Sequence, residues 1–240
     1  MIISFLRALG TAVVCLAILG VLPAEGADTA PKTRLFILSG QSNMKNLNPD
    51  DTFTPALKAA YPNDDIIVVK DAQSGNPIRR WYKDWKSASG DPMDAGKNGR
   101  LYTRLMAAVN EALKDKPKPD TVTFLWMQGE ADTHSADTAN VYADSLKWLI
   151  SRIRTDLKRP DTYVVIGRIS DFNYEEFPEG VKTVREAEVA VAEADPLAGW
   201  IDTDDLNGEQ NGLHYTKDGY AKLGQRFAEK AIALEKLKTR

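Results

Sequence analysis

Ser42 is the residue of this sequence whose setting best suits nucleophilic chemistry. It lies in the turn Ser39-Gly40-Gln41-Ser42-Asn43, directly after an apolar run at residues 35–38. Such a run, followed by small and amide residues, is typical of a buried strand that ends in a tight turn. A strand end is rigid and can present a serine to a substrate. Serine at this kind of position is more often a turn former or a helix cap, so Ser42 alone does not establish an enzyme.

A serine nucleophile needs a base, and the sequence offers two histidines. A serine hydroxyl is a weak nucleophile at neutral pH, and histidine is the usual group that takes its proton. His214 lies just before the last predicted helix, in Asn211-Gly212-Leu213-His214-Tyr215. His134 follows the third predicted strand, in a setting more typical of a solvated loop residue. We therefore expect His214 to be the base.

Acyl transfer also needs donors that face the oxygen on which negative charge develops. The backbone N–H groups of Ser42 and Gly75 are available if the loop around Gly75 folds over the turn that carries Ser42. The side-chain amide of Gln128 is a third candidate donor. An amide in this position also serves to brace a loop, so its role stays open at this point.

The periodicity of the apolar residues predicts an alternation of strands and helices. Besides residues 35–38, apolar runs predict strands at residues 66–69, 122–127, 163–169 and 199–201. Helical spacing predicts helices at residues 101–113, 141–157, 181–194 and up to residue 238, the last one capped by Thr216. Nearly continuous apolar strands that alternate with helices indicate a parallel sheet covered on both faces. We expect one domain, an α/β/α sandwich of three layers with a five-stranded parallel sheet, similar to flavodoxin.

This architecture predicts where the site lies, because open α/β sheets bind ligands outside the carboxyl ends of their strands. Polar clusters follow four of the five predicted strands. They are Ser42, then Ser74-Gly75-Asn76, then Gln128-Gly129-Glu130-Ala131-Asp132, and finally the acidic residues 202–205 with His214. We expect these clusters to meet at one edge of the sheet.

Three motifs of the chain resemble those of a known enzyme family. Gly40-Gln41-Ser42-Asn43-Met44, the segment Trp126-x-Gln128-Gly129-Glu130-x-Asp132, and His214 followed by Gly219-Tyr220 are similar to the sialate O-acetylesterase-like branch of the SGNH hydrolases. The resemblance implies an acetyl esterase for carbohydrates without a metal or organic cofactor. It also implies Ser42 as nucleophile, His214 as base, and Ser42, Gly75 and Gln128 as the oxyanion hole. A Gly-x-Ser-x-Gly elbow, which marks the ordinary α/β-hydrolase fold, is absent.

One position departs from the pattern of this family. The family usually has an aspartate three residues before the histidine, and this chain has Asn211 there. An amide can hold the imidazole but brings no charge to stabilise the imidazolium. A carboxylate from elsewhere is the alternative, and the candidates are Glu130, Asp204, Asp205 and Glu209.

Aromatic and basic residues crowd the segment after the predicted oxyanion loop. Trp81 or Trp85 could stack on a sugar ring, and Arg79 or Arg80 could pair with a carboxylate or sulfate of an acidic glycan. The alternative is that a tryptophan packs the loop onto the core while the arginines brace it.

The N-terminus has the pattern of a secretory signal peptide. A single Arg7 precedes an apolar stretch that ends at residue 22, and small residues allow cleavage after Gly26. We expect residues 1–26 to be the signal, 27–32 a linker and 33–240 the hydrolase domain. The only cysteine, Cys15, lies in the signal, so the mature chain would be secreted or periplasmic and free of disulfides.

Charge and composition narrow the classes of partner. The formal net charge of −3 is made of interspersed charges of both signs, so nucleic acid and stable membrane association after signal removal are not expected. Together with the signal pattern, the resemblance to the sialate O-acetylesterase-like enzymes implies a secreted serine esterase that removes O-acetyl groups from carbohydrates through an acetyl-enzyme intermediate. The alternatives are a carbohydrate-binding pseudoenzyme with little turnover, and an esterase for other small acyl esters.

Overall fold

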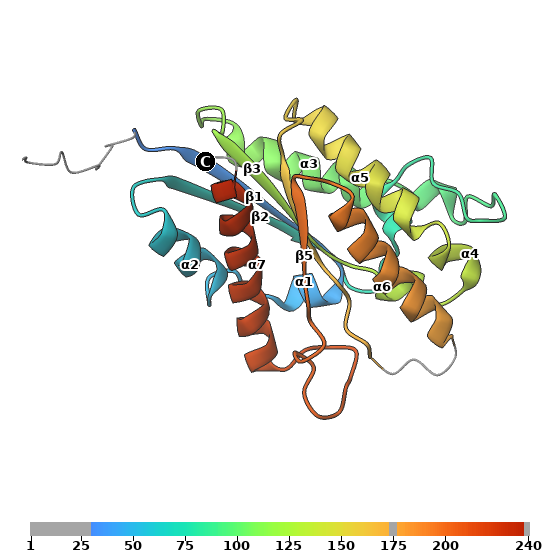
Figure 1. Cartoon of the computed structure of the whole chain (residues 1–240). Helices are drawn as coiled ribbons and strands as arrows, with labels where there is room; N and C mark the ends of the chain where they lie inside the picture. Colours follow the sequence, from blue (N-terminus) through green and yellow to red (C-terminus); the bar gives the residue numbers. More distant parts are fainter. Residues whose placement is uncertain (1–29, 173–176, 238–240) are drawn as a thin grey trace, which may run out of the picture. The chain divides into compact units, whose positions relative to one another are not determined.

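A five-stranded, fully parallel sheet forms the centre of the protein in a computed structural model, which describes residues 30–172 and 177–237 (Figure 1). The predicted signal at residues 1–26 lies outside the described residues. The strands are β1 (Thr33–Gly40), β2 (Asp65–Ala72), β3 (Thr121–Met127), β4 (Tyr163–Gly167) and β5 (Ala198–Ile201), in the order β2-β1-β3-β4-β5. The prediction of a five-stranded parallel sheet is confirmed.

Helices cover both faces of this sheet. They are α1 (Ser42–Asn46), α2 (Phe53–Ala60), α3 (Arg100–Leu113), α4 (Ala136–Ala139), α5 (Tyr142–Asp156), α6 (Pro178–Glu193) and α7 (Lys217–Leu237), with short 3-10 turns η1 (Ile78–Trp81), η2 (Ala95–Lys97) and η3 (Glu130–Asp132). Helix α7 packs beside α2 on one face, and α5 packs beside α6 on the other (Figure 1). The three-layer sandwich is therefore also confirmed.

Strand β1 is an interior strand of the sheet, between β2 and β3. Every residue of β1 is buried, because helices lie over both faces and strands flank both edges. Phe36 packs edge-on against Phe53 of α2, with 5.8 Å between ring centroids. Truncating such a buried phenylalanine to alanine costs roughly 3–5 kcal/mol, so β1 is a rigid support for the turn that follows it.

The strand order places the end of β1 at the point where the chain changes direction across the sheet. From β1 the chain moves outward to β2, and it then returns to β3 on the other side of β1. Ligand sites of doubly wound sheets lie at this switch point, outside the carboxyl ends of the strands. Ser42 follows β1 directly, so the topology positions it where a site is expected.

Several element boundaries differ from the predicted ones. The fourth strand ends at Gly167 and not at residue 169, because the N–H of Ile169 donates to the carboxylate of Glu188 instead of to a strand. Helix α6 begins at Pro178, where proline fits the first turn of a helix because the N–H it lacks would be unpaired there. The short helices α1 and α2 were not predicted.

The predicted cap of the last helix is confirmed. The Thr216 hydroxyl accepts the N–H of Gly219 at 2.9 Å, as an N-cap side chain does. A Cβ on Gly219 would lie 2.0 Å from the carbonyl oxygen of Leu206, so glycine lets the start of α7 approach the preceding loop closely. These contacts fix the direction in which the chain leaves the His214 loop.

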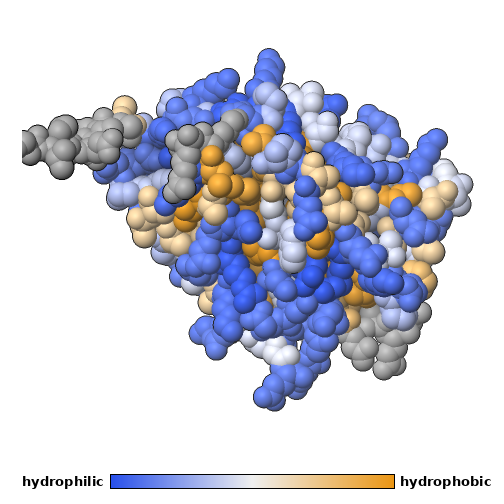
Figure 2. Space-filling model, viewed as in Figure 1, coloured by the Kyte–Doolittle hydropathy of each residue, from blue (hydrophilic) through white to orange (hydrophobic). Residues whose placement is uncertain are grey.

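The described part of the chain has a mainly hydrophilic surface on the face seen in Figure 2. Figure 2 shows that hydrophilic residues cover most of the face that carries α7, with smaller apolar areas between them. Among the described residues, no helix is both long enough and apolar enough to cross a membrane.

Candidate active site

Ser42 lies at the start of α1, in a turn that is fixed against β3. Gly40 ends β1 with a φ of +148°, and a Cβ there would lie 1.9 Å from the carbonyl oxygen of Met127. The N–H of Gln41 donates to that same oxygen at 2.9 Å. Only glycine permits this close approach of the two strands. The turn therefore holds Ser42 rigidly, with 5% of its surface exposed.

Ser42 lines a cavity of about 610 Å³ at the carboxyl edge of the sheet. The cavity brings together residues from loops that are far apart in the sequence: Ser42, Gly75, Arg79, Glu130, His134 and His214. The structure thus brings together the predicted nucleophile, the predicted base and the residues of both predicted backbone donors. His134, for which the sequence favoured a solvated loop, is exposed and also lines the cavity.

His214 is exposed, but the residues on either side of it are anchored. The carbonyl oxygen of Leu213 accepts a hydrogen bond from the side chain of Asn43 at 3.1 Å. On the other side, Tyr215 is buried and its hydroxyl donates to Thr203 at 2.8 Å. The backbone that carries the imidazole is therefore fixed relative to Ser42.

Asn43 connects the nucleophile turn with the rest of the site. Its Nδ2 donates to Glu130 Oε1 at 2.8 Å and to the Leu213 carbonyl oxygen, while its Oδ1 accepts the Tyr220 hydroxyl at 3.0 Å. Both amide hydrogens are used, and the side chain is fully buried. Sequence reasoning assigned no role to Asn43. Its position directly after the nucleophile within the quoted motif was the available signal.

Glu130 is the only predicted His-orienting residue that lines the cavity with Ser42 and His214. Its Oε1 accepts from Asn43, whereas its Oε2 is buried and has no hydrogen-bond partner in the described part of the chain. Burial raises the pKa of the Glu130 carboxyl, and the bond from Asn43 acts in the opposite direction. The carboxyl therefore belongs to the lining of the Ser42 cavity, and its second oxygen is buried there.

Asn211, at the position where the family has an aspartate, bonds to other loop residues. Its backbone is left-handed, with a φ of 45°. Its Nδ2 donates to the carbonyl oxygen of Asp171 at 3.1 Å, and its Oδ1 accepts from Asn207 at 2.6 Å. The Asn211 side chain thus braces its own loop, and it is not among the residues that line the cavity.

The other candidate acids of this loop also lie outside the cavity lining. Asp205 forms two hydrogen bonds with Arg226, at 2.6 and 2.8 Å, and this arginine lowers the pKa of its carboxyl. Asp204 pairs with Arg185 at 2.6 Å. Glu209 is exposed. The assignment of the group that orients His214 therefore stays a prediction, and the placement favours Glu130.

The two backbone donors of the predicted oxyanion hole are placed differently from the side-chain donor. Ser42 is the first residue of α1, where an N–H has no carbonyl partner within the helix. Gly75 is exposed in a loop, with a φ of +65°, and lines the cavity. Gln128 is fully buried, and its Nε2 donates to Asp132 at 2.6 Å and to the carbonyl oxygen of Asn76 at 3.1 Å. Its two hydrogens are thus engaged, so a direct role in the oxyanion hole stays a prediction.

Asp132 holds the loop of Gly75 in place. Its Oδ2 accepts both Gln128 Nε2 and the N–H of Ile78, the latter at 2.8 Å. Burial raises the pKa of Asp132 to about 7, against the hydrogen bonds from Gln128 and Ile78 that lower it. Sequence reasoning quoted this residue in a motif but gave it no role. Its function follows from a contact between two loops that the sequence does not show.

The predicted substrate-binding residues separate into two groups. Arg79 lines the cavity, its Nε has no hydrogen-bond partner within the described residues, and its closest acid is Asp94 at 3.9 Å. Arg80 is buried and pairs with Asp94 at 2.9 Å. Trp81 and Trp85 are each 1% exposed and lie outside the cavity lining, in the core.

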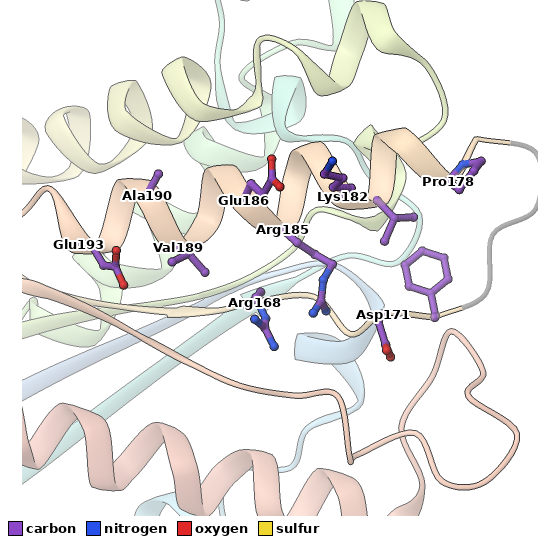
Figure 3. Close-up of a pocket in the computed structure, with 11 residues that line it drawn as sticks. Arg168, Asp171, Pro178, Lys182, Arg185, Glu186, Val189, Ala190 and Glu193 are labelled. Atoms are coloured by element: carbon purple, nitrogen blue, oxygen red, sulfur yellow. The ribbon is translucent and has the colours of Figure 1, made fainter.

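A second cavity, of about 880 Å³, lies along α6 (Figure 3). Arg185 of α6 extends toward Arg168, which directly follows β4 (Figure 3). Both guanidinium groups pair with Asp204, at 2.6 and 2.7 Å. Neither Ser42 nor His214 lines this cavity. Its two arginines are neutralised by Asp204, and it contains neither the serine nor the histidine expected for acyl transfer, so we do not assign the reaction to it.

No group of three or more histidine, cysteine, aspartate or glutamate side chains is arranged to hold a metal ion within residues 30–172 and 177–237. The groups that line the cavity include the Ser42 hydroxyl and three further hydroxyl side chains, two imidazoles, a buried carboxyl, a guanidinium and the residues of two candidate backbone N–H donors. This set suits nucleophilic attack on a carbonyl with proton transfer through histidine.

Comparison with known proteins agrees with the resemblance seen in the motifs. A family model described as carbohydrate esterase, sialic acid-specific acetylesterase, matches residues 45–233. The match begins just after Ser42, so it does not itself test the nucleophile. It covers well over half of the chain and confirms the family predicted from the sequence.

Individual relatives are distant in sequence. A probable carbohydrate esterase of Arabidopsis thaliana is 24% identical over 186 residues, which are 76% of this chain and 62% of the relative. An X-ray structure of an Arabidopsis thaliana protein has a TM-score of 0.65 at 20% identity and covers 85% of this chain and 99% of that one. A carbohydrate acetylesterase from Xanthomonas citri has a TM-score of 0.59 at 16% identity, over 85% of this chain and 56% of that one. At these identities the two structures confirm the fold.

Proposed function

Since this chain belongs to the carbohydrate esterase family of sialic acid-specific acetylesterases, we propose that it is a serine esterase that removes O-acetyl groups from carbohydrates. The observation that carries the proposal is that Ser42, His214 and Gly75 line one cavity, although they come from three different loops. Arg79 and a buried carboxyl in the same cavity add polar groups that can bind a sugar.

The reaction proceeds in two steps on these residues. His214 takes the proton of the Ser42 hydroxyl while its oxygen attacks the acetyl carbonyl, and the N–H groups of Ser42 and Gly75 stabilise the resulting oxyanion. Each such donor typically contributes about 3 kcal/mol. Collapse of the intermediate releases the sugar hydroxyl, which receives the proton from His214, and leaves an acetyl group on Ser42. Water then attacks with the same base, releases acetate and restores the serine.

Asn43 and Glu130 act by positioning the base. Asn43 ties the backbone before His214 to the helix that starts with Ser42. Glu130 accepts from Asn43 and keeps one buried oxygen at the edge of the cavity. A carboxylate at this place stabilises the positive charge that His214 acquires during the reaction.

Export is a further part of the proposal. Residues 1–26 have the pattern of a signal peptide, with cleavage after Gly26. N-terminal sequencing of protein recovered from the periplasm or the medium tests this: a chain that starts at Ala27 supports export, and a chain that starts at Met1 and stays inside the cell contradicts it.

Substitution of the two central residues tests the esterase proposal. We expect Ser42→Ala and His214→Ala each to lower kcat on a small acetyl ester by at least about 10³-fold, with unchanged thermal unfolding. Rate should also fall at acid pH, where the imidazole is protonated and cannot act as a base. Comparable turnover by Ser42→Ala would refute the proposal.

A carbohydrate-binding protein with little turnover is the second candidate function. It is favoured by one observation: in the described part of the chain, no hydrogen bond joins His214 to a carboxylate, and the amide of Asn211 bonds elsewhere. An inert wild type combined with an active Asn211→Asp variant would establish this second function.

A further inference from the structure

A cavity of about 960 Å³ lies between α3 and α5, outside the catalytic cavity and larger than it. We call it the α3–α5 groove. Tyr102 of α3 and Trp148 of α5 form part of its wall, together with exposed polar residues such as Asn110 and Arg152. None of these residues takes part in the esterase mechanism described above. The groove is therefore a candidate for a separate binding function.

Trp148 is held in a fixed orientation by other aromatic rings. Its ring stacks on Tyr82 with 3.8 Å between centroids and 7° between planes, and Tyr102 meets it edge-on at 6.5 Å. Tyr82 does not line the groove, so it supports the Trp148 ring from the side that faces away from the groove. A ring that is already immobilised loses little conformational entropy when a ligand binds.

The polar groups of the groove are also held in place. The Tyr102 hydroxyl donates to Asp156 at 2.7 Å, and Arg152 donates to the same oxygen at 2.9 Å. Lys83 and Asp84 are exposed and line the groove as well. Aromatic walls combined with fixed planar and charged groups suit a sugar, whose ring faces are apolar and whose hydroxyls both donate and accept hydrogen bonds.

The turn η1 contributes residues to both the groove and the catalytic cavity. Arg79 of η1 lines the catalytic cavity, whereas Trp81 of the same turn and the nearby Lys83 line the groove. The N–H of Gly99, another groove residue, donates to the carbonyl oxygen of Arg79 at 3.0 Å. A long chain bound in the groove therefore lies next to the cavity that contains Ser42.

We propose that the α3–α5 groove is a second carbohydrate-binding site, which holds an extended polysaccharide chain while its acetyl groups reach Ser42. This inference rests on the proposed function, because it takes the substrate to be a carbohydrate. Tethering by the groove raises the local concentration of ester groups at the catalytic cavity. It lowers KM for acetylated polymers and leaves turnover of small acetyl esters unchanged.

Affinity electrophoresis in the inactive Ser42→Ala background tests the binding directly. The gels contain deacetylated xylan, glucomannan or polygalacturonate, and retardation by at least one of them is expected. Adding Trp148→Ala should abolish the retardation. Adding Ala107→Trp, which places a large side chain on an exposed groove position of α3, should do the same without removing a packed ring. Trp200→Ala on β5 is the matched control and should keep wild-type mobility.

Kinetics in the active background separate this inference from the proposed function. Trp148→Ala and Ala107→Trp should raise KM for acetylated xylan at least about tenfold and leave kcat/KM for a small acetyl ester unchanged. Absence of retardation by all three polysaccharides, or retardation that persists in both groove variants, would overturn the second site. An inert wild type on the small ester would instead contradict the proposed function, whatever the gels show.

Discussion

The side-chain amide of Asn43 donates to the carbonyl oxygen of Leu213 at 3.1 Å, so the neighbour of Ser42 holds the neighbour of His214. The same nitrogen donates to Glu130 at 2.8 Å. The nucleophile turn, the base loop and a buried carboxyl thus meet at one side chain. This contact joins the loop of His214 to the turn of Ser42.

Removal of the Asn43 amide should impair catalysis more than stability. Asn43→Ala frees the Leu213 loop, and a displacement of the base by about 1 Å can cost 10²-fold in rate. We expect kcat/KM for a small acetyl ester to fall by about that factor, and the free energy of unfolding to fall by about 1–3 kcal/mol. Asn48→Ala is the control, since this exposed amide lies just after the same helix and bonds Asp50 and Asp51 instead of the site. Equal activity of the two variants would contradict the role of Asn43.

Glu130 and Asn211 can be compared as candidates for orienting His214. Glu130→Gln keeps the acceptor oxygen for Asn43 but removes the charge, so we expect kcat to fall about tenfold or more. Asn211→Asp should not raise kcat, because its side chain bonds Asn207 and Asp171 and a carboxylate cannot donate to the Asp171 carbonyl oxygen. Steady-state kinetics of both variants decide the matter. An Asn211→Asp variant faster than wild type would assign the orienting role to position 211.

Asp132 should make the protein less stable as pH rises. Burial raises its pKa from 3.8 to about 7. Between these two pH values the carboxyl is protonated in the folded protein and ionised in the unfolded chain. The free energy of unfolding should therefore fall as pH rises from about 4 to about 8, by up to roughly 4 kcal/mol from this group. Burial raises the pKa of Glu130 and Glu188 as well, in the same direction.

Chemical denaturation at several pH values measures this effect. In Asp132→Asn, whose amide oxygen can still accept the N–H of Ile78, the decrease with pH should be smaller. Asp205→Asn is the control. Arg226 lowers the pKa of this exposed acid, so the contribution of Asp205 to the free energy of unfolding rises with pH instead of falling. An Asp132→Asn variant with the wild-type pH dependence would show that Asp132 is not the titrating group.

Arg79 should select for acidic substrates. It lines the catalytic cavity, and its nearest ion-pair partner among the described residues, Asp94, is 3.9 Å away, so no close ion pair neutralises the guanidinium. We expect Arg79→Gln to raise KM for acetyl esters of acidic sugars by about 10- to 100-fold, and to change KM for neutral sugar esters little. Lys58→Gln, which removes an exposed positive charge of α2 outside both this cavity and the α3–α5 groove, is the control. An equal effect of Arg79→Gln on both classes of ester would exclude this selection.

The fold could be predicted because its strands are nearly continuous apolar runs. Each predicted strand corresponds to a strand of the sheet, since burial on both faces leaves a strong signal in the sequence. The signal marks burial rather than strand pairing, and this is why Ile169, which is buried outside the sheet, was assigned to a strand. Helix α2 is only eight residues long, too short for its pattern to stand out.

The meeting of Ser42 and His214 at one cavity could also be predicted, because parallel strands bring their carboxyl ends to one edge. The contacts between the loops could not be predicted from the sequence. The side chain of Asn43 donates to the Leu213 carbonyl oxygen, and that of Asp132 accepts the N–H of Ile78. Both bonds depend on how the loops pack, which the sequence pattern does not indicate. Likewise Trp81 follows the predicted oxyanion loop in sequence, yet it packs edge-on against Trp126 in the core.

Labelling of the nucleophile tests the central claim most directly. An organophosphonate fluoride transfers its phosphonyl group to an activated serine and releases fluoride, and peptide mapping then identifies the residue. The account predicts one label per chain, on Ser42, with loss of acetyl ester turnover in proportion to labelling and much slower labelling of His214→Ala. Full turnover by protein labelled at Ser42, or a label on another serine with Ser42 unmodified, would contradict it.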